Sequence, residues 1–139
     1  MILRNFDING DMQAVLDLWN NAGEGIGLSP SDRPEELRKK LRRDPDLFLV
    51  AEEDDKIVGA VLGGFDGRRG MVYHLAVSQH QRRKGTGSLL MAELESRLRA
   101  KGCLKYYLLV KPDNQEAHDF YGELGWEQMD LHVMGKVIE

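Results

Sequence analysis

A basic turn between an apolar strand and an amphipathic helix limits the folds open to this chain more than any other feature. Residues 71–77, before the turn, have the apolar pattern of a buried strand. After it, Leu90, Leu94 and Leu98 recur every four residues with charged residues between them, as on one face of a helix. The pattern therefore predicts a mixed α/β fold in which this strand passes directly into a helix.

The turn itself, residues 81–87, has the composition of an anion site. The first N–H groups of a helix lack partners within the helix, and the helix dipole adds partial positive charge there. Arg82, Arg83 and Lys84 add full charge, and Gly85 and Gly87 allow close approach to the backbone. These features suit a polyphosphate. The alternative is a plain helix start with solvated cations.

Two common phosphate motifs do not fit the spacing. A Walker loop requires Gly-Lys-Ser/Thr, whereas Lys84 precedes Gly85 here. A dinucleotide fingerprint requires a third glycine where Leu90 stands.

The sequence Arg82-x-x-Gly85-x-Gly87 instead resembles the coenzyme A pyrophosphate loop of the GNAT superfamily of N-acetyltransferases, Gln/Arg-x-x-Gly-x-Gly/Ala. A second segment, residues 114–126, is similar to the family's Asn-x-x-Ala-x-x-Phe/Tyr-Tyr-x-x-x-Gly-Phe. Both segments occur in the family's order. The resemblance is to the small bacterial single-domain members.

The resemblance implies a GNAT fold in one domain over residues 1–139. This is a mixed, largely antiparallel sheet of six or seven strands with four helices and a splayed parallel pair that holds acetyl-CoA. The residue pattern agrees with that order. It predicts strands at 2–6, 47–51, 57–62, 70–77 and 106–110, weak strands at 126–130 and 132–137, and helices from Asp11, at 34–43, at 86–101 and at 114–124, the second capped by Ser31 or Asp32.

The family motifs also assign roles to residues. The backbone of residues 75–77 is expected to pair with the pantetheine arm, with strand 104–110 as the other wall. The residues implied to bind the cofactor are Leu75, Ala76, Val77, Arg82, Arg83, Lys84, Gly85, Thr86, Gly87, Ser88, Asn114 and Tyr121.

Two of these residues have alternative roles. Tyr121 matches a tyrosine that protonates the departing thiolate, a role suited to a phenol with a pKa of about 10. The alternative is a packed aromatic beside Phe120 on an amphipathic helix. Asn114 could bind the cofactor arm, cap a helix, or do both.

The general base is not defined by the motifs. Strands 70–77 and 103–111 contain no carboxylate, and Leu109 stands where ribosomal-protein alanine acetyltransferases carry a Glu. Met71 and Tyr73 are expected on the cleft face, by alternation with Leu75 and Val77.

Three sources of the base stay open. His74 has suitable chemistry, but alternation predicts that it faces the opposite side and has a structural role. Glu52 or Glu53 could act through water. The third possibility is an amine that is already neutral.

Acceptor specificity is expected in the first two helices and in residues 23–30. Glu24, Asp32, Glu35 and Glu36 could attract a cationic amine. The alternative is a solvated acidic face.

Composition narrows the functional class. The net charge of −4 gives no support to nucleic-acid or membrane binding, and a single cysteine, Cys103, excludes an internal disulfide. No transmembrane run, signal peptide or metal motif is recognised, so a cytoplasmic monomer or homodimer without a metal is expected. We expect an acetyl-CoA-dependent N-acetyltransferase that acts on a primary amine by direct transfer. The alternative is a non-catalytic coenzyme A binding module.

Overall fold

The computed structural model describes residues 1–22 and 28–139, which divide into two compact units, Met1–Leu109 and Val110–Glu139. The expectation of one domain over 1–139 stays a prediction.

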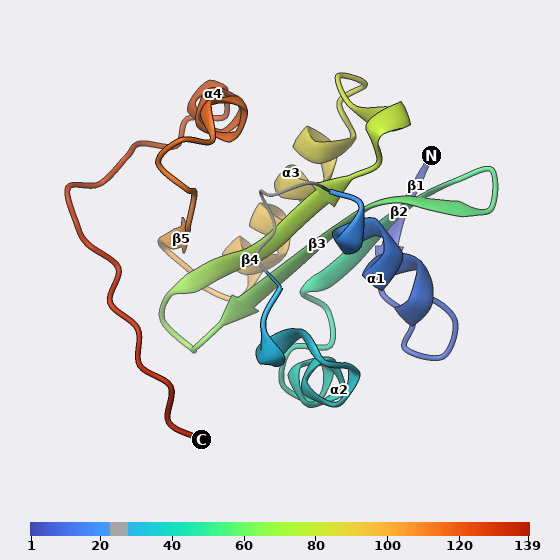
Figure 1. Cartoon of the computed structure of the whole chain (residues 1–139), viewed down its shortest axis with the longest axis horizontal. Coiled ribbons are helices and arrows are strands. Elements are labelled where there is room, and N and C mark those ends of the chain that lie inside the picture. Colours follow the sequence, from blue (N-terminus) through green and yellow to red (C-terminus); the bar gives the residue numbers. More distant parts are fainter. Residues whose placement is uncertain (23–27) are drawn as a thin grey trace. The chain divides into compact units, whose positions relative to one another are not determined.

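A five-stranded mixed sheet forms the centre of the first unit (Figure 1). Its strands follow the order of the sequence: β1 (Ile2–Asn5), β2 (Phe48–Glu53), β3 (Lys56–Phe65), β4 (Gly70–Val77) and β5 (Tyr106–Leu108). Neighbouring strands are antiparallel except β4 and β5, which are parallel. The mixed, largely antiparallel class with one parallel pair is therefore confirmed.

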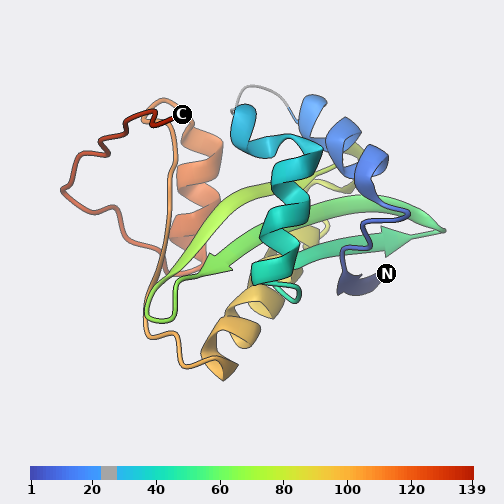
Figure 2. The same cartoon turned by 90° about the horizontal axis from the view of Figure 1, so that it is seen from below.

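Helices cover both faces of this sheet (Figure 2). One face carries α1 (Met12–Asn20) and α2 (Pro34–Arg43), and the other carries α3 (Thr86–Ala100). Two short 3-10 helices, η1 (Pro30–Asp32) and η2 (Gln79–Gln81), precede α2 and α3. None of the helices in the described residues is both long and apolar enough to span a bilayer.

Apolar side chains fix the position of each layer. Under α1, the rings of Phe6 and Phe48 stack at 4.2 Å between centroids, and Trp19 stacks on Phe48 at 6.0 Å. On the other face, the predicted stripe of α3 is buried, with Leu90 and Leu94 fully covered. A β-carbon at Gly63 would lie 2.6 Å from Leu94 Cδ1, so only glycine lets α3 pack this closely.

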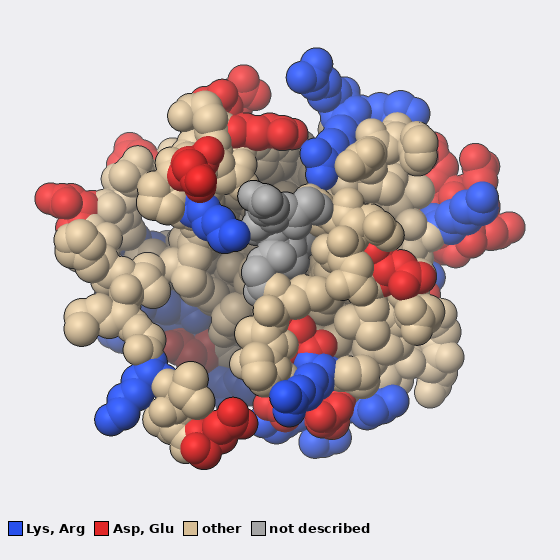
Figure 3. Space-filling model, in the orientation of Figure 1, with Lys and Arg blue, Asp and Glu red and all other residues tan. Residues whose placement is uncertain are grey.

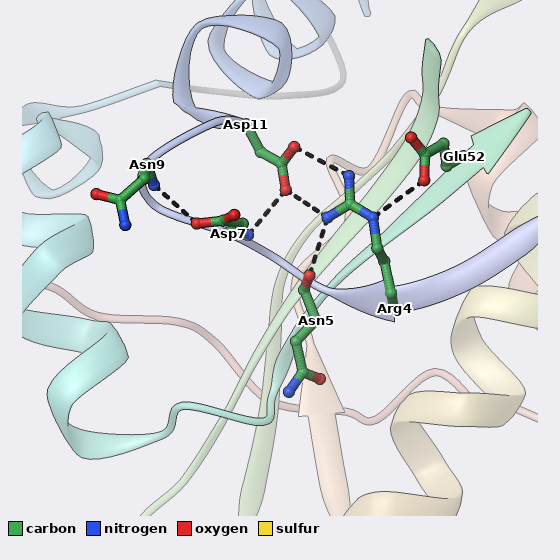
Figure 4. Close-up of polar contacts among 6 residues, drawn as sticks. All are labelled: Arg4, Asn5, Asp7, Asn9, Asp11 and Glu52. Carbon is green, nitrogen blue, oxygen red and sulfur yellow. Dashed lines mark hydrogen bonds and ion pairs between the residues drawn. The ribbon is translucent and has the colours of Figure 1, made fainter. Parts of the chain in front are cut away.

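A polar cluster anchors β1 to the start of α1 (Figure 4). Arg4 donates from Nη1 and Nη2 to the two carboxylate oxygens of Asp11, at 2.6 and 3.0 Å, and from Nε to Glu52 at 3.1 Å. The backbone N–H of Asp7 also donates to Asp11, at 2.8 Å. These hydrogen bonds, with that from Arg4 the largest cause, hold the pKa of Asp11 below its usual value.

The predicted helix caps are wrong in their chemistry. Asp11 occupies the N-cap of α1, but its side chain makes no capping bond there because Arg4 and Asp7 engage it. The N-cap of α2 is Arg33, not Ser31 or Asp32. Asp32 belongs instead to η1, where its carboxylate accepts from Ser29 N at 3.0 Å.

The second unit contains one helix, α4 (Gln115–Glu123), and no strand. The weak strands predicted at 126–130 and 132–137 are therefore wrong, and the described residues form five strands rather than six or seven. A strand needs a ladder partner, and no described strand pairs with this segment. Its apolar side chains are correspondingly exposed, Met134 to 93%.

Candidate functional site

The turn between β4 and α3 has the local conformation of an anion site. Gly85 adopts a left-handed φ of +84° at the N-cap of α3, and Arg83 has a φ of +65°. These two positions reverse the chain and leave Arg82, Arg83 and Lys84 exposed. Figure 3 shows basic side chains gathered over this turn.

The first turn of α3 supplies backbone donors at the same place. Its first helical bond runs from Leu89 N to Gly85 O at 3.0 Å. The N–H groups of Thr86, Gly87 and Ser88 therefore have no acceptor within the helix. Because the helix dipole adds positive charge there, these donors and the neighbouring cations form a suitable cradle for a polyphosphate.

Contacts from other elements hold the turn in place. The Thr86 side chain is 1% exposed, and its hydroxyl donates to Met1 Sδ at 3.6 Å. Gln81 Nε2 donates to Glu53 Oε2 at 2.5 Å, and Arg82 Nη2 donates to Ala22 O at 3.4 Å. Thr86 thus contributes its backbone to the cradle, whereas its side chain fastens the helix.

The edge of β4 that leads away from the turn is open. Pairing with β5 covers only Gly70 to Val72, opposite Tyr106 to Leu108. Beyond Val72, no described strand pairs with that edge of β4. The backbone of residues 75–77 is therefore available for an extended ligand to add as a further strand.

A β-bulge lies where this open edge begins. Leu62 pairs with His74, but the next residue of β3, Gly63, pairs with Val72, so Tyr73 is the extra residue. The bulge breaks the alternation of side chains. Tyr73 lies beneath the Lys40 ammonium of α2, which is 5.8 Å from the ring centroid, and the His74 ring meets Trp19 of α1 at 4.9 Å.

Two predictions based on alternation are consequently wrong. Tyr73 and His74 lie on the same face, the one that α1 and α2 cover. Ala76 packs in the cluster under α1, so Leu75 and Val77 face α3 and share no face with Tyr73.

His74 pairs with a carboxylate from η1. Its Nε2 lies 2.8 Å from Asp32 Oδ1, and the two side chains are only 12% and 11% exposed. The other oxygen of Asp32 accepts from Ser29 N. Because a carboxylate only accepts, Nε2 carries the proton, and the lone pair of the neutral ring resides on Nδ1.

Three other carboxylates considered for the site bond to residues away from His74. Glu52 bonds to Arg4 and Glu53 to Gln81, and both stand on β2, which β3 separates from β4. Glu36 pairs with Lys39 at 2.7 Å on an exposed face of α2. Glu24 and residues 23–27 of the predicted specificity segment lie outside the described residues.

Tyr121 and Asn114 belong to the second unit. Asn114 caps α4, its Oδ1 accepting from Ala117 N at 3.1 Å, which confirms one of its two predicted roles. The Tyr121 ring meets Phe120 at 5.0 Å and Trp126 at 5.8 Å. Burial raises the pKa of Tyr121 to about 12, so the phenol keeps its proton at neutral pH.

Similarity to known proteins decides the family. The model of the acetyltransferase (GNAT) family matches residues 12–126. The chain belongs to the GNAT family. An acetyltransferase of Pectobacterium atrosepticum is 42% identical over 127 residues, covering 91% of this chain and 88% of that protein.

Solved structures share the GNAT fold. Ard1 of Thermoplasma volcanium aligns with a TM-score of 0.73 at 25% identity, over 89% of this chain and 80% of that one. PaiA N-acetyltransferase of Thermoplasma acidophilum, in complex with coenzyme A, aligns with a TM-score of 0.79 at 20% identity, over 94% and 92% of the two chains. Family membership identifies the chain as an enzyme, an N-acetyltransferase.

The sequence pattern did not predict the pairing of His74 with Asp32 in this GNAT protein. Asp32 is 42 residues away from His74, and a bulge has no unique sequence signal. The only local hint was the pair Gly63–Gly64 on β3, because glycines within a strand often mark a bulge. Among residues 1–22 and 28–139, no three His, Cys, Asp or Glu side chains are grouped to hold a metal ion.

Proposed function

We propose that this protein transfers the acetyl group of acetyl-CoA directly to a primary amine while both substrates are bound. The observation that carries the proposal is the turn before α3, where three backbone donors and a cluster of cations meet at a helix N-terminus. The pyrophosphate of coenzyme A would accept hydrogen bonds from residues 86–88, with Arg82, Arg83 and Lys84 as counter-charges.

The open edge of β4 suits the rest of the cofactor. An amide-containing arm that leaves the turn would run back along residues 75–77 and bond to their backbone, as in strand addition. Its thioester would then end near the bulge at Tyr73 and His74. PaiA, which shares the fold, has been solved with coenzyme A bound, and this agrees with the proposed ligand.

Tyr121 is proposed as the acid that protonates the departing thiolate. A matched motif position supports this role, and its raised pKa keeps the proton available. Asn114 would bind the cofactor arm through the part of its amide that does not cap α4.

The acceptor is proposed to be a small-molecule or protein amine, recognised by α1, α2 and the segment before α2. We further propose a cytoplasmic monomer or homodimer that needs no metal and binds neither nucleic acid nor membrane. The net charge of −4 supports the last point, because phosphate-rich partners favour a basic surface.

Calorimetric titration with acetyl-CoA tests the cradle. We expect tight binding to the wild type and its loss in Gly87→Glu, because the new carboxylate would repel the pyrophosphate. Gly87→Ala is the matched control, since it adds a β-carbon without charge and should bind much better than Gly87→Glu. Equal binding by the wild type and a folded Gly87→Glu would reject the assignment.

Thiol release from acetyl-CoA, measured against a panel of amines and peptides, tests turnover. We expect release that depends on a primary amine. Tight cofactor binding without release for any amine would favour the non-catalytic alternative.

A further inference from the structure

We infer that His74, held by Asp32, is the general base that removes the proton of the acceptor amine. The inference deepens the proposed function and rests on it. It supplies the group that the sequence motifs leave undefined, because neither β4 nor β5 carries a carboxylate.

The first step is the position of the ring along β4. Residues 75–77 form the open edge next to the cofactor turn, and His74 directly precedes them. A ligand that enters at the turn and follows this edge reaches His74 after it has passed Leu75. The thioester end of acetyl-CoA is therefore expected at His74, at the opposite end of the arm from the pyrophosphate.

The second step is the face onto which the ring points. The bulge places His74 and Tyr73 together on the side of α1 and α2, where the segment after α1 also contributes Asp32. Tyr73, the adjacent residue on that face, is 53% exposed, so the surface beside the imidazole is open to solvent, whereas the His74 side chain itself is 12% exposed. β-Bulges are common next to active sites because they re-aim side chains in this way.

The third step concerns which nitrogen of the imidazole is bonded and which can accept a proton. Asp32 occupies Nε2 at 2.8 Å and fixes the ring, while Nδ1 makes no hydrogen bond to any residue that the structure describes. A base oriented by a third group is the common arrangement for activating a nucleophile. The carboxylate also stabilises the imidazolium that forms when Nδ1 takes a proton.

The charged and titratable groups around His74 come from several elements. Asp32 faces it from η1, and α1 contributes the uncharged ring of Trp19. Tyr73 is its neighbour on β4, with the Lys40 ammonium of α2 over that ring, and Lys40 is itself bonded to Asp44. Asp32 is therefore the charge in direct contact with the imidazole.

The reaction balances with this assignment. His74 Nδ1 accepts one proton from the ammonium form of the acceptor and passes it to solvent. The neutral nitrogen then forms a bond to the thioester carbonyl carbon, and the carbon–sulfur bond breaks. The second proton passes from nitrogen to solvent as the amide forms. The thiolate gains a proton from Tyr121, and Tyr121 regains one from solvent, so one proton is released overall. The products are an N-acetyl amine and coenzyme A.

Two probe amines of nearly equal size separate a base from a structural residue. Ethylamine is an ammonium ion at neutral pH, whereas trifluoroethylamine is largely neutral there because fluorine withdraws electrons. His74→Gln keeps a donor near Asp32 but removes the basic nitrogen. We expect turnover with ethylamine to fall about 10²-fold, in the range of general base catalysis, and turnover with trifluoroethylamine to fall much less.

Asp32→Asn is the second variant, and it retains the size of the partner while removing its charge. We expect a smaller loss, on the order of 10-fold, again greater for ethylamine. Raising the pH should restore much of the ethylamine rate in both variants, because the amine then loses its proton to solvent. Calorimetry should show unchanged acetyl-CoA affinity.

The outcomes are distinct. A wild type that binds acetyl-CoA but acetylates neither the two probes nor any amine or peptide of the panel overturns the proposed function and the inference with it. An active wild type with equal losses for the two amines in His74→Gln, or with no loss, overturns the role of His74 alone. If His74→Gln fails to fold, an equal loss for both amines in folded Asp32→Asn overturns the pair.

Discussion

Two partly buried acid–base pairs in the first unit, Arg4–Asp11 and His74–Asp32, look alike and do different things. The carboxylates are covered to the same degree, with side chains 9% exposed in Asp11 and 11% in Asp32. Arg4 uses all three guanidinium nitrogens on Asp11, Glu52 and the Asn5 carbonyl, and arginine does not release its proton. Burial alone therefore does not distinguish the two pairs.

The two pairs differ in whether the basic group has a nitrogen without a hydrogen bond to the described residues and in whether that group can change its charge. Each of the three guanidinium nitrogens of Arg4 is hydrogen-bonded and its charge is fixed, so this pair holds β1 to α1 and does not move a proton. The imidazole of His74 has one nitrogen bonded and can change its charge, so it can move a proton. The comparison predicts that damage to the first pair appears in stability and damage to the second in rate.

The largest effect is expected at Tyr121, and it sharpens the comparison by separating the two protons of the reaction. If His74 handles only the amine proton, Tyr121→Phe should lower turnover about 10²-fold or more, because the thiolate then lacks its acid. Single-turnover kinetics measure this step. Trp126→Phe is a packing control, since it alters the same aromatic contact without removing the phenol.

Cofactor affinity and melting temperature should be nearly preserved in Tyr121→Phe. An unchanged chemistry-limited rate would reject the role of Tyr121. A loss of stability that matches the loss of rate would show that its aromatic packing is the more important contribution.

The next effect is the loss of stability when the Arg4–Asp11 pair is weakened. Asp11→Asn should lower the free energy of unfolding by about 2 kcal/mol, because it weakens charged hydrogen bonds to Arg4. Turnover well below the melting temperature should stay close to that of the wild type. Asp17→Asn, an exposed site on the same helix, is the control and should change little. A rate loss in folded Asp11→Asn would break the comparison.

A smaller effect is the pH dependence of the same cluster. The folded-state pKa of Asp11 is lowered, so its contribution is fully present above the unfolded value of about 3.9 and is lost as the pH falls through the folded value. The stability gap between wild type and Asp11→Asn should therefore narrow in acid. Chemical denaturation across pH measures the gap, and a constant gap would contradict the role of Asp11.

The smallest effect is expected on the exposed acidic face of α2. The Glu36–Lys39 pair has side chains that are 37% and 65% exposed, so Glu36→Gln should change stability by about 0.5 kcal/mol or less. The Michaelis constant of Glu36→Gln for a cationic amine distinguishes the two interpretations of this face, acceptor binding and a merely solvated acidic surface. A raised constant with unchanged coenzyme A affinity supports acceptor binding, whereas an unchanged constant leaves the face with solvation alone.

Local patterns predicted most of this fold and the position of the turn before α3. Period and spacing located β4 and α3, and the stripe of Leu90, Leu94 and Leu98 is buried as expected. The conformation of the turn also follows from local sequence, because Gly85 adopts the left-handed φ.

The rest depended on contacts between distant residues. Alternation placed Tyr73 and His74 on opposite faces, but one bulge brought them to the same face. The apolar pattern after residue 126 predicted strands, yet no described strand pairs with that segment. Asp32, the partner of His74, and Glu52, a partner of Arg4, come from segments that only folding brings near.

A crystal structure of the protein with coenzyme A bound tests the central claim most directly. It should show the pyrophosphate bonded to the N–H groups of residues 86–88 and the pantetheine arm along residues 75–77. The thiol should end beside Tyr73 and His74, on the face that α1 and α2 cover. Coenzyme A bound away from the turn, or with its thiol on the face that α3 covers, would contradict the account.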